Sequence, residues 1–160
     1  MRGFCMTSCL LLMATLPATG SETNPDAAQG SDRDFVVAAA QAGQQEIHDA
    51  GIAAARSRMD GVRKLAGMLL EDHRVSTARL LALADAKAMR LPAAAPSPNP
   101  TASFSDTEFV AAQTQQHEEA IALYQSEAAN GADKEFRRFA AQALPVLQRH
   151  LQALRALQTP

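Results

Sequence analysis

Four stretches of the sequence place apolar or small residues at steps of three and four, the spacing that puts side chains on one face of an α-helix. They cover roughly residues 32–57, 60–89, 106–129 and 133–157. Ala accounts for 34 of the 160 residues, and it combines the highest helix propensity with a side chain small enough for closely packed helices. Only 4% of the residues are aromatic, so the composition disfavours strands. The sequence predicts an all-α domain.

Short turns separate the first stretch from the second and the third from the fourth, so each pair is expected to form an antiparallel hairpin. The hairpins cover 32–90 and 105–157, within one domain over 32–157. The linker between them, 91–104, is rich in Pro. An extended linker of this length spans about 43 Å, and a helix of about 26 residues is about 39 Å long. The linker can therefore cross the whole bundle, as a ferritin-like four-helix bundle requires.

Capping motifs mark the ends of these helices. The segment from Ser105 to Glu108 has the form of a capping box at the start of the third helix, and a weaker version begins at Ser31. Gly131 predicts a left-handed turn at the end of the third helix. Asp133 is then placed to start the fourth.

The first 20 residues have the layout of a secretory signal peptide. Arg2 precedes an apolar run from Phe4 to Leu16, and small residues at Ala18 and Gly20 allow cleavage before Ser21. The run is shorter than the ~20 residues that a membrane span needs. We therefore expect an exported protein, periplasmic or secreted, without a stable membrane span after cleavage. Residues 21–31 are expected to form a disordered leader.

Composition excludes several classes of function. Both cysteines, Cys5 and Cys9, lie inside the predicted signal peptide, so the mature chain would have neither disulfides nor thiol catalysis. A net charge of −2 gives no basic footprint, so we expect no nucleic-acid partner. The sequence leaves protein partners open, including a second copy of the chain in a homo-oligomer.

One titratable residue interrupts the inward-facing stripe of each predicted helix: Glu46, His73, His117 and His150. Glu46 and His73 lie at nearly equal distances from the first turn, so they are level across the first hairpin. His117 and His150 are likewise level across the second hairpin. All four side chains are therefore expected at mid-depth in the core of the bundle.

Three imidazoles and a carboxylate in a bundle core form a suitable ligand set for Zn²⁺, Fe²⁺, Mn²⁺ or Cu²⁺. A buried charge is costly unless it is paired or bound to a metal. The flanking carboxylates of Asp72, Glu118 and Glu119 are candidates for further ligands, or for partners that hold an imidazole in one tautomer.

The alternative is that the inward residues form two structural pairs, Glu46–His73 and His117–His150, with no metal. No helix carries the Glu-x-x-His step of carboxylate-bridged di-iron proteins, which disfavours a ferroxidase centre. The sequence also has no Gly-rich phosphate loop, nucleophile elbow or zinc-finger spacing. It therefore predicts no particular reaction.

Five segments carry a family resemblance: Phe35 to Ala42, Glu46-Ile47, Met68 to His73, His117-Glu118 and Ala143 to His150. They resemble the bacterial domain-of-unknown-function family numbered 4142. The resemblance covers about residues 32–157 and implies a ferritin-like fold and export, but no established activity. Family members usually have an acidic residue two positions after the first-helix Glu. Here that position is His48, which adds a ligand or removes one.

Two functions remain open from the sequence. The first is an exported bundle that binds a transition metal through the inward Glu/His cluster. The second is a non-enzymatic envelope or stress interaction module, in which the same residues only hold the bundle together.

Overall fold

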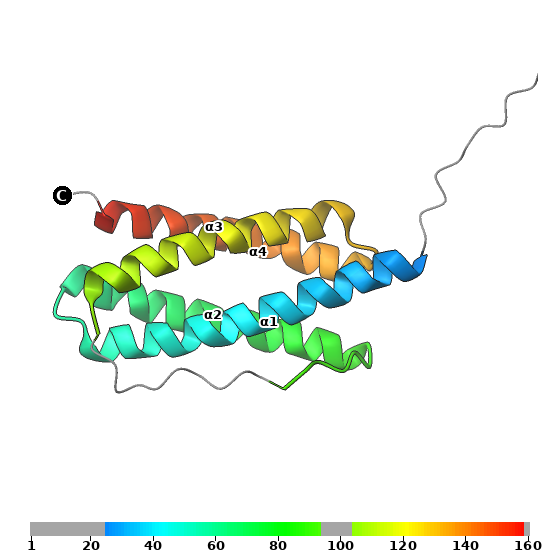
Figure 1. The fold of residues 1–160 in the computed structure, drawn as a ribbon, viewed down its shortest axis with the longest axis horizontal. Helices are drawn as coiled ribbons and strands as arrows, with labels where there is room; N and C mark the ends of the chain where they lie inside the picture. The colour runs from blue at the N-terminus through cyan, green and yellow to red at the C-terminus, as the bar shows by residue number, and fades with distance from the viewer. Residues whose placement is uncertain (1–24, 94–103, 159–160) are drawn as a thin grey trace, which may run out of the picture.

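The computed structural model describes residues 25–93 and 104–158, with side chains from Asp32 onward (Figure 1). The predicted signal peptide and most of the predicted linker lie outside the described residues. The described chain forms four helices and no strand: α1 (Pro25–Arg56), α2 (Asp60–Ala86), α3 (Asp106–Asn130) and α4 (Lys134–Gln158). The predicted all-α four-helix bundle is confirmed.

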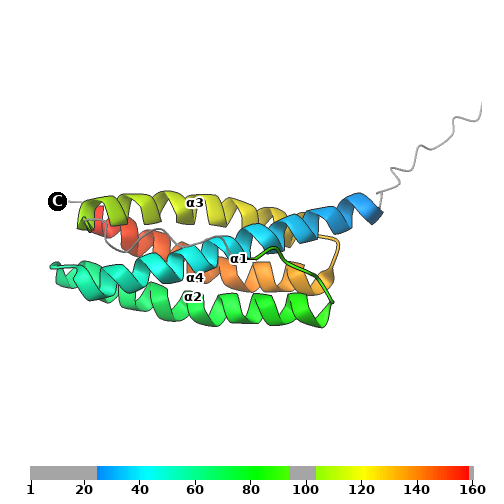
Figure 2. The same ribbon diagram turned by 60° about the horizontal axis from the view of Figure 1, so that its bottom comes forward.

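The helices form two antiparallel hairpins. α1 packs against α2 and α3, and α4 packs against α3 and α2. Every neighbouring pair runs antiparallel, and α2 ends at the opposite end of the bundle from the start of α3 (Figures 1 and 2). The two points that the linker joins are therefore a bundle length apart, as the ferritin-like crossover requires.

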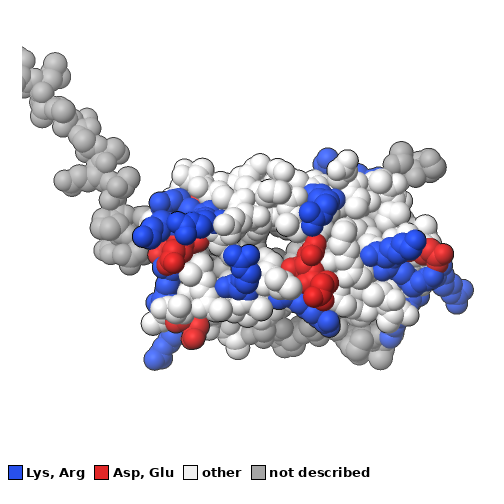
Figure 3. Space-filling view, turned by 180° about the vertical axis from the view of Figure 1, so that it is seen from behind, with Lys and Arg blue, Asp and Glu red and all other residues white. Residues whose placement is uncertain are grey.

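The surface formed by α2 and α4 carries acidic and basic side chains side by side (Figure 3). Lys87 at the end of α2 forms salt bridges to Asp133 at 2.7 Å and to Glu135 at 2.6 Å. Arg149 on α4 lies 3.3 Å from Asp72 on α2. These contacts connect the two hairpins at the surface.

The first helix starts earlier than the sequence predicted. α1 begins at Pro25, so residues 25–31, which were expected in a disordered leader, are helical. Pro suits the first helical position because no N–H partner is needed there, and the Asp and Ala residues that follow permit another turn. The predicted cap at Ser31 is wrong, because this residue lies inside the helix.

Asp32 joins α1 to the turn between α3 and α4. Its Oδ1 atom accepts a hydrogen bond from the backbone N–H of Ala132 at 2.7 Å, and Oδ2 accepts one from Asp133 at 2.8 Å. Asp133 Oδ1 in turn accepts a hydrogen bond from the backbone N–H of Glu135 at 2.7 Å. Asp133 therefore starts the fourth helix as predicted, and Asp32 holds this turn in place.

The predicted left-handed cap at the end of α3 is wrong. Gly131 has φ −54° and ψ 145°, because the chain leaves the helix in an extended conformation. A Cβ atom at Gly131 would nevertheless meet the Glu127 carboxylate, so close packing explains the glycine. At the other end of α3 the predicted cap is confirmed, since Ser105 Oγ accepts a hydrogen bond from the backbone N–H of Glu108 at 3.3 Å.

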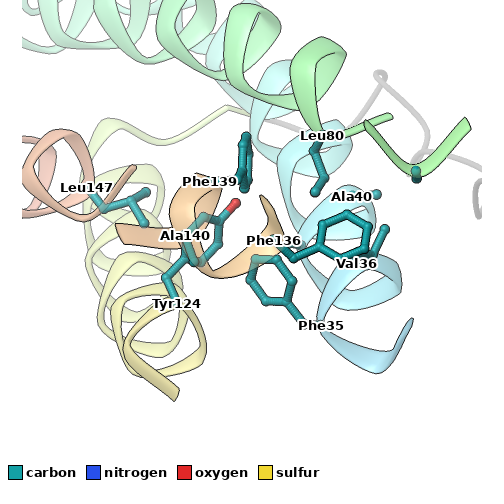
Figure 4. Close-up of a cluster of buried hydrophobic side chains, with 11 residues drawn as sticks. Phe35, Val36, Ala40, Leu80, Tyr124, Phe136, Phe139, Ala140 and Leu147 are labelled. Atoms are coloured by element: carbon teal, nitrogen blue, oxygen red, sulfur yellow. The ribbon is translucent and has the colours of Figure 1, made fainter. Parts of the chain in front are cut away.

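Two apolar clusters fill the ends of the bundle, and a polar layer separates them. One cluster is built around Phe35, Leu80, Tyr124 and Phe136 (Figure 4). The other contains Val62, Leu65, Leu69, Phe109 and Leu154. Between the two clusters along every helix lie the four inward residues that the sequence predicted: Glu46, His73, His117 and His150, each at most 6% exposed.

Gly43 brings α1 and α2 close together one turn before this layer. A Cβ atom at Gly43 would meet Thr77 Oγ1, and Thr77 itself is buried. A larger residue here therefore requires the Thr77 side chain or the two helices to shift.

Candidate metal centre

Three imidazole rings from three helices meet in the polar layer. The ring centroids of His73, His117 and His150 lie 5.4 to 5.5 Å apart in all three pairs, a nearly equilateral arrangement. One nitrogen from each ring lies within 4.8 Å of the other two. The prediction that these side chains meet in the core is confirmed as geometry.

Two of the rings are held by acceptors that lie outside the cluster. His73 Nδ1 donates to Glu46 Oε2 at 2.9 Å. His117 Nδ1 donates to the backbone carbonyl of Gln113 at 2.9 Å, and the same nitrogen lies 3.4 Å from Glu46 Oε1. Because a carboxylate and a carbonyl only accept, the Nδ1 atom of each ring carries the proton.

The third ring has the same arrangement with its nitrogens exchanged. His150 Nε2 donates to Asp72 Oδ2 at 2.8 Å, and Arg149 donates to the same oxygen at 3.3 Å. Burial tends to raise the pKa of Asp72, but the hydrogen bonds from His150 and Arg149 outweigh it and lower the pKa. Asp72 is therefore a carboxylate at neutral pH, and it fixes the Nε2–H tautomer of His150.

These three anchors leave three lone pairs facing one another. His73 Nε2 is buried without a hydrogen-bond partner. His117 Nε2 lies 3.3 Å from His150 Nδ1, and neither nitrogen carries a proton in the anchored tautomers. An arrangement of acceptors without a donor is unfavourable by itself and favourable around a cation.

Burial favours the neutral form of two of the rings, His117 and His150. Burial lowers the pKa of His117, against the attraction of Glu46. Burial also lowers the pKa of His150 to about 4, assisted by repulsion from His73 and His117 and opposed by Asp72. Neutral imidazole is the form that binds a metal ion.

The remaining candidates from the sequence lie elsewhere. Glu118 is exposed and forms a salt bridge to Arg155 at 2.7 Å, so the structure does not bring it to the cluster. Glu119 is exposed and accepts a hydrogen bond from Gln115 at 2.8 Å. His48 is half-buried and makes no contact with the three rings. Of the flanking carboxylates, only Asp72 holds an imidazole.

Glu46 lies beside the cluster, on its anchoring side. Its Oε2 atom accepts from His73 Nδ1, so the carboxylate lies behind this ring relative to the free Nε2. The sequence did not predict the Gln113 carbonyl, because every residue has a carbonyl and only its position four residues before His117 distinguishes this one.

The family is settled by the sequence match. A family model with the description "Domain of unknown function (DUF4142)" matches residues 17–157. The chain belongs to the DUF4142 family. The resemblance seen in the sequence is thereby confirmed. No curated protein matches this DUF4142 chain.

Two solved structures share the fold of this DUF4142 chain. One is a conserved hypothetical protein, Rv2844, from Mycobacterium tuberculosis, with a TM-score of 0.69 and 18% identity over 81% of this chain and 92% of that chain. The other is a DUF305 fragment from Deinococcus radiodurans, with a TM-score of 0.66 and 16% identity over 79% of this chain and 94% of that chain. At these identities the likeness shows the helical bundle and nothing further.

The four helices are amphipathic and not apolar on all sides. Within residues 25–93 and 104–158, no helix has both the length and the hydrophobicity to cross a bilayer.

Proposed function

We propose that this DUF4142 chain binds one transition metal ion through His73 Nε2, His117 Nε2 and His150 Nδ1. One observation supports this most strongly: each ring gives one nitrogen to an acceptor outside the cluster and turns the other inward. Metal-bound histidines characteristically donate their second N–H to a carboxylate or a backbone carbonyl. Glu46, the Gln113 carbonyl and Asp72 fill these roles.

The distances suit a small ion. A tetrahedral site with Zn–N bonds of 2.0–2.1 Å places the nitrogens about 3.3 Å apart. His117 Nε2 and His150 Nδ1 already have this separation of 3.3 Å. The His73 nitrogen lies within 4.8 Å of the other two and would approach them by up to about 1.5 Å to complete the set.

The ligand chemistry favours some metals over others. With Glu46 and Asp72 as anchors, the protein ligands are three nitrogens and no oxygen. Imidazole suits Zn²⁺ and Cu²⁺, whereas Mn²⁺ prefers carboxylate and water. Three protein ligands also leave one coordination position open, as in catalytic zinc sites.

The alternative function is an interaction module with a metal-free core. Glu46–His73 at 2.9 Å and His117–His150 at 3.3 Å are the structural pairs that it requires. A hydrogen bond in the second pair needs a proton on one inward nitrogen. If a neutral ring moves its proton to the inward nitrogen, it loses its hydrogen bond to Gln113 or Asp72. If the ring instead takes up a second proton, it becomes charged, and burial opposes this. The metal reading needs neither change.

Calorimetric and thermal titrations with Zn²⁺ and Cu²⁺ test the proposal. The wild-type chain is expected to bind one ion and to gain about 2.7 kcal/mol at 100 times Kd, a rise of about 10 °C in Tm. His73→Gln is expected to lose this gain. His48→Gln on α1 is the matched control and keeps it. Absence of binding in the wild type contradicts the proposal.

We also propose export, on the basis of the first 20 residues alone. Fractionation of bacteria that express the full chain is expected to find it outside the cytoplasm. Amino-terminal sequencing is expected to begin at Ser21, and a cytoplasmic chain that retains Arg2 contradicts this proposal.

A further inference from the structure

A cavity of about 200 Å³ lies between α2 and α4 and ends at the His cluster. His73, His150 and Asp72 belong to its lining. A hollow is visible near the middle of this face of the molecule, beside acidic and basic groups (Figure 3). Two of the three proposed ligands therefore reach a space that is large enough for a small molecule.

The walls of this α2–α4 cavity are mainly apolar. The apolar and aromatic lining residues are Val75, Tyr124, Phe139, Ala143, Val146 and Leu147. Val75 is 54% exposed, and it is one of only two large apolar side chains that are exposed in the described part of the chain. An apolar wall that continues to the surface favours a ligand with an apolar body.

Besides the residues at the His cluster, the polar side chains in this lining are Ser76, Arg79 and Gln142. Arg79 and Gln142 belong to the lining, and Arg79 donates a hydrogen bond to Gln142 Oε1 at 3.3 Å, from α2 to α4. Both side chains are exposed, which places a cation at the mouth. At the other end the Asp72 carboxylate also belongs to the lining, and a divalent ion there would exceed its single negative charge, so that end also favours an anionic group.

A second cavity, lined mainly by α1 and α3, also includes His73 and Leu147 in its lining but has different chemistry. It measures about 320 Å³, and its lining includes Glu46, Gln116 and Glu119. Ala120 forms part of its wall, as Ala143 does on the α2–α4 side. No Lys or Arg lines the α1–α3 cavity among the described residues, so it does not favour an anion.

We infer that the α2–α4 cavity binds a short-chain monocarboxylate, whose headgroup occupies the open coordination position of the metal ion. The inference rests on the proposed metal site. The alkyl chain lies against Val75, Val146 and Leu147, and Arg79 adds attraction at the mouth. The centre is then a ligand-binding site and not a closed structural one.

Titration of the Co²⁺-loaded full chain with butyrate tests this inference. Co²⁺ replaces Zn²⁺ in such sites, and its visible spectrum reports a change of ligand. Butyrate is expected to cause a saturable spectral change, and neutral butyramide a weaker one. Ala143→Leu puts an isobutyl group into the α2–α4 cavity and is expected to weaken butyrate binding at least about 10-fold. Ala120→Leu makes the same change in the other cavity and is expected to leave butyrate binding unchanged.

The outcomes separate the two proposals. Co²⁺ binding is measured by calorimetry in each variant before butyrate is added. A chain that binds no Co²⁺ overturns the proposed function and this inference with it. A chain that binds Co²⁺ but shows no saturable butyrate change overturns this inference alone. Equal butyrate affinities in Ala143→Leu and the wild type also overturn this inference and leave the proposed function standing. Arg79→Gln is expected to weaken butyrate binding by less than Ala143→Leu does, because Arg79 lies at the mouth of the cavity and the carboxylate binds at the other end.

Discussion

His117 Nε2 lies 3.3 Å from His150 Nδ1, and each of these rings donates its other N–H to an acceptor outside the pair. Two lone pairs therefore face each other in a buried layer. His73 Nε2, which has no hydrogen-bond partner, faces the same region. This relationship distinguishes a prepared cation site from an ordinary pair of core histidines, in which one ring donates to the other.

Ligands and anchors are expected to respond differently to substitution. His150→Gln removes a proposed ligand and should weaken Zn²⁺ binding by more than about 100-fold. Asp72→Asn keeps an acceptor but loses the charge that holds His150, and should weaken binding by about 10-fold. Calorimetric Zn²⁺ titration measures both effects. Glu118→Gln, at an exposed carboxylate, is the control and should match the wild type. Equal losses in Asp72→Asn and His150→Gln would argue against the division into ligands and anchors.

The metal-free fold should lose stability in acid through His150. Its pKa is about 4 in the folded chain, against about 6.5 when unfolded. Between these values the unfolded chain binds a proton that the folded chain does not, so the free energy of unfolding falls as pH decreases from 6.5 to 4. The loss should be about 2 kcal/mol. Denaturant titrations in chelator at several pH values test this. His150→Gln should flatten the dependence, and an unchanged slope would exclude His150 as its source.

Glu127 should act in the opposite direction. Burial and the neighbouring Asp32 carboxylate raise its pKa to about 7, against 4.5 for the ordinary side chain. The folded chain therefore holds a proton that the unfolded chain releases, and stability falls as pH rises from 4.5 to 7. Glu127→Gln keeps the shape without the charge and should raise the free energy of unfolding at pH 8 by about 1–2 kcal/mol. At pH 4 it should have little effect. Glu119→Gln, at an exposed position on the same helix, is the control. A Glu127→Gln substitution that stabilises the chain more at pH 4 than at pH 8 would refute the assignment.

The close approach of α1 and α2 at Gly43 should be sensitive to one methyl group. Gly43→Ala places Cβ against Thr77 Oγ1, and the cost should be about 1–3 kcal/mol. Gly51→Ala on the same helix meets no atom within 4 Å and should stabilise the chain by about 0.4–1 kcal/mol, because Ala favours the helix. Thermal unfolding of both variants gives the comparison. A neutral Gly43→Ala would contradict the tight contact between Gly43 and Thr77.

Local patterns predicted most of the fold. The steps of three and four placed three of the four helices within about three residues of their observed ends, because helix formation depends on neighbouring residues. The start of α1 at Pro25 was not predicted, because Pro fits the first helical position and Gly30 is tolerated inside the helix. The extended backbone conformation of Gly131 was also not predicted, because the position of the Glu127 side chain beside it cannot be read from the local sequence.

The site was predictable in its members and not in its chemistry. Helical periodicity placed His73, His117 and His150 in one buried layer. It could not say which nitrogen of each ring faces inward, because this depends on acceptors such as Asp72, 78 residues away from His150 in the chain. For Glu46 the sequence left two roles open, metal ligand or partner of His73, and in the structure its Oε2 lies 2.9 Å from His73 Nδ1.

The most direct test of the metal centre is a crystal structure of the Zn²⁺-loaded chain with anomalous data at the zinc edge. The account predicts one peak per chain, about 2.0–2.1 Å from His73 Nε2, His117 Nε2 and His150 Nδ1, with Glu46 and Asp72 still on the opposite nitrogens. A peak bound by surface carboxylates, or an empty layer in crystals soaked with excess Zn²⁺, would contradict it.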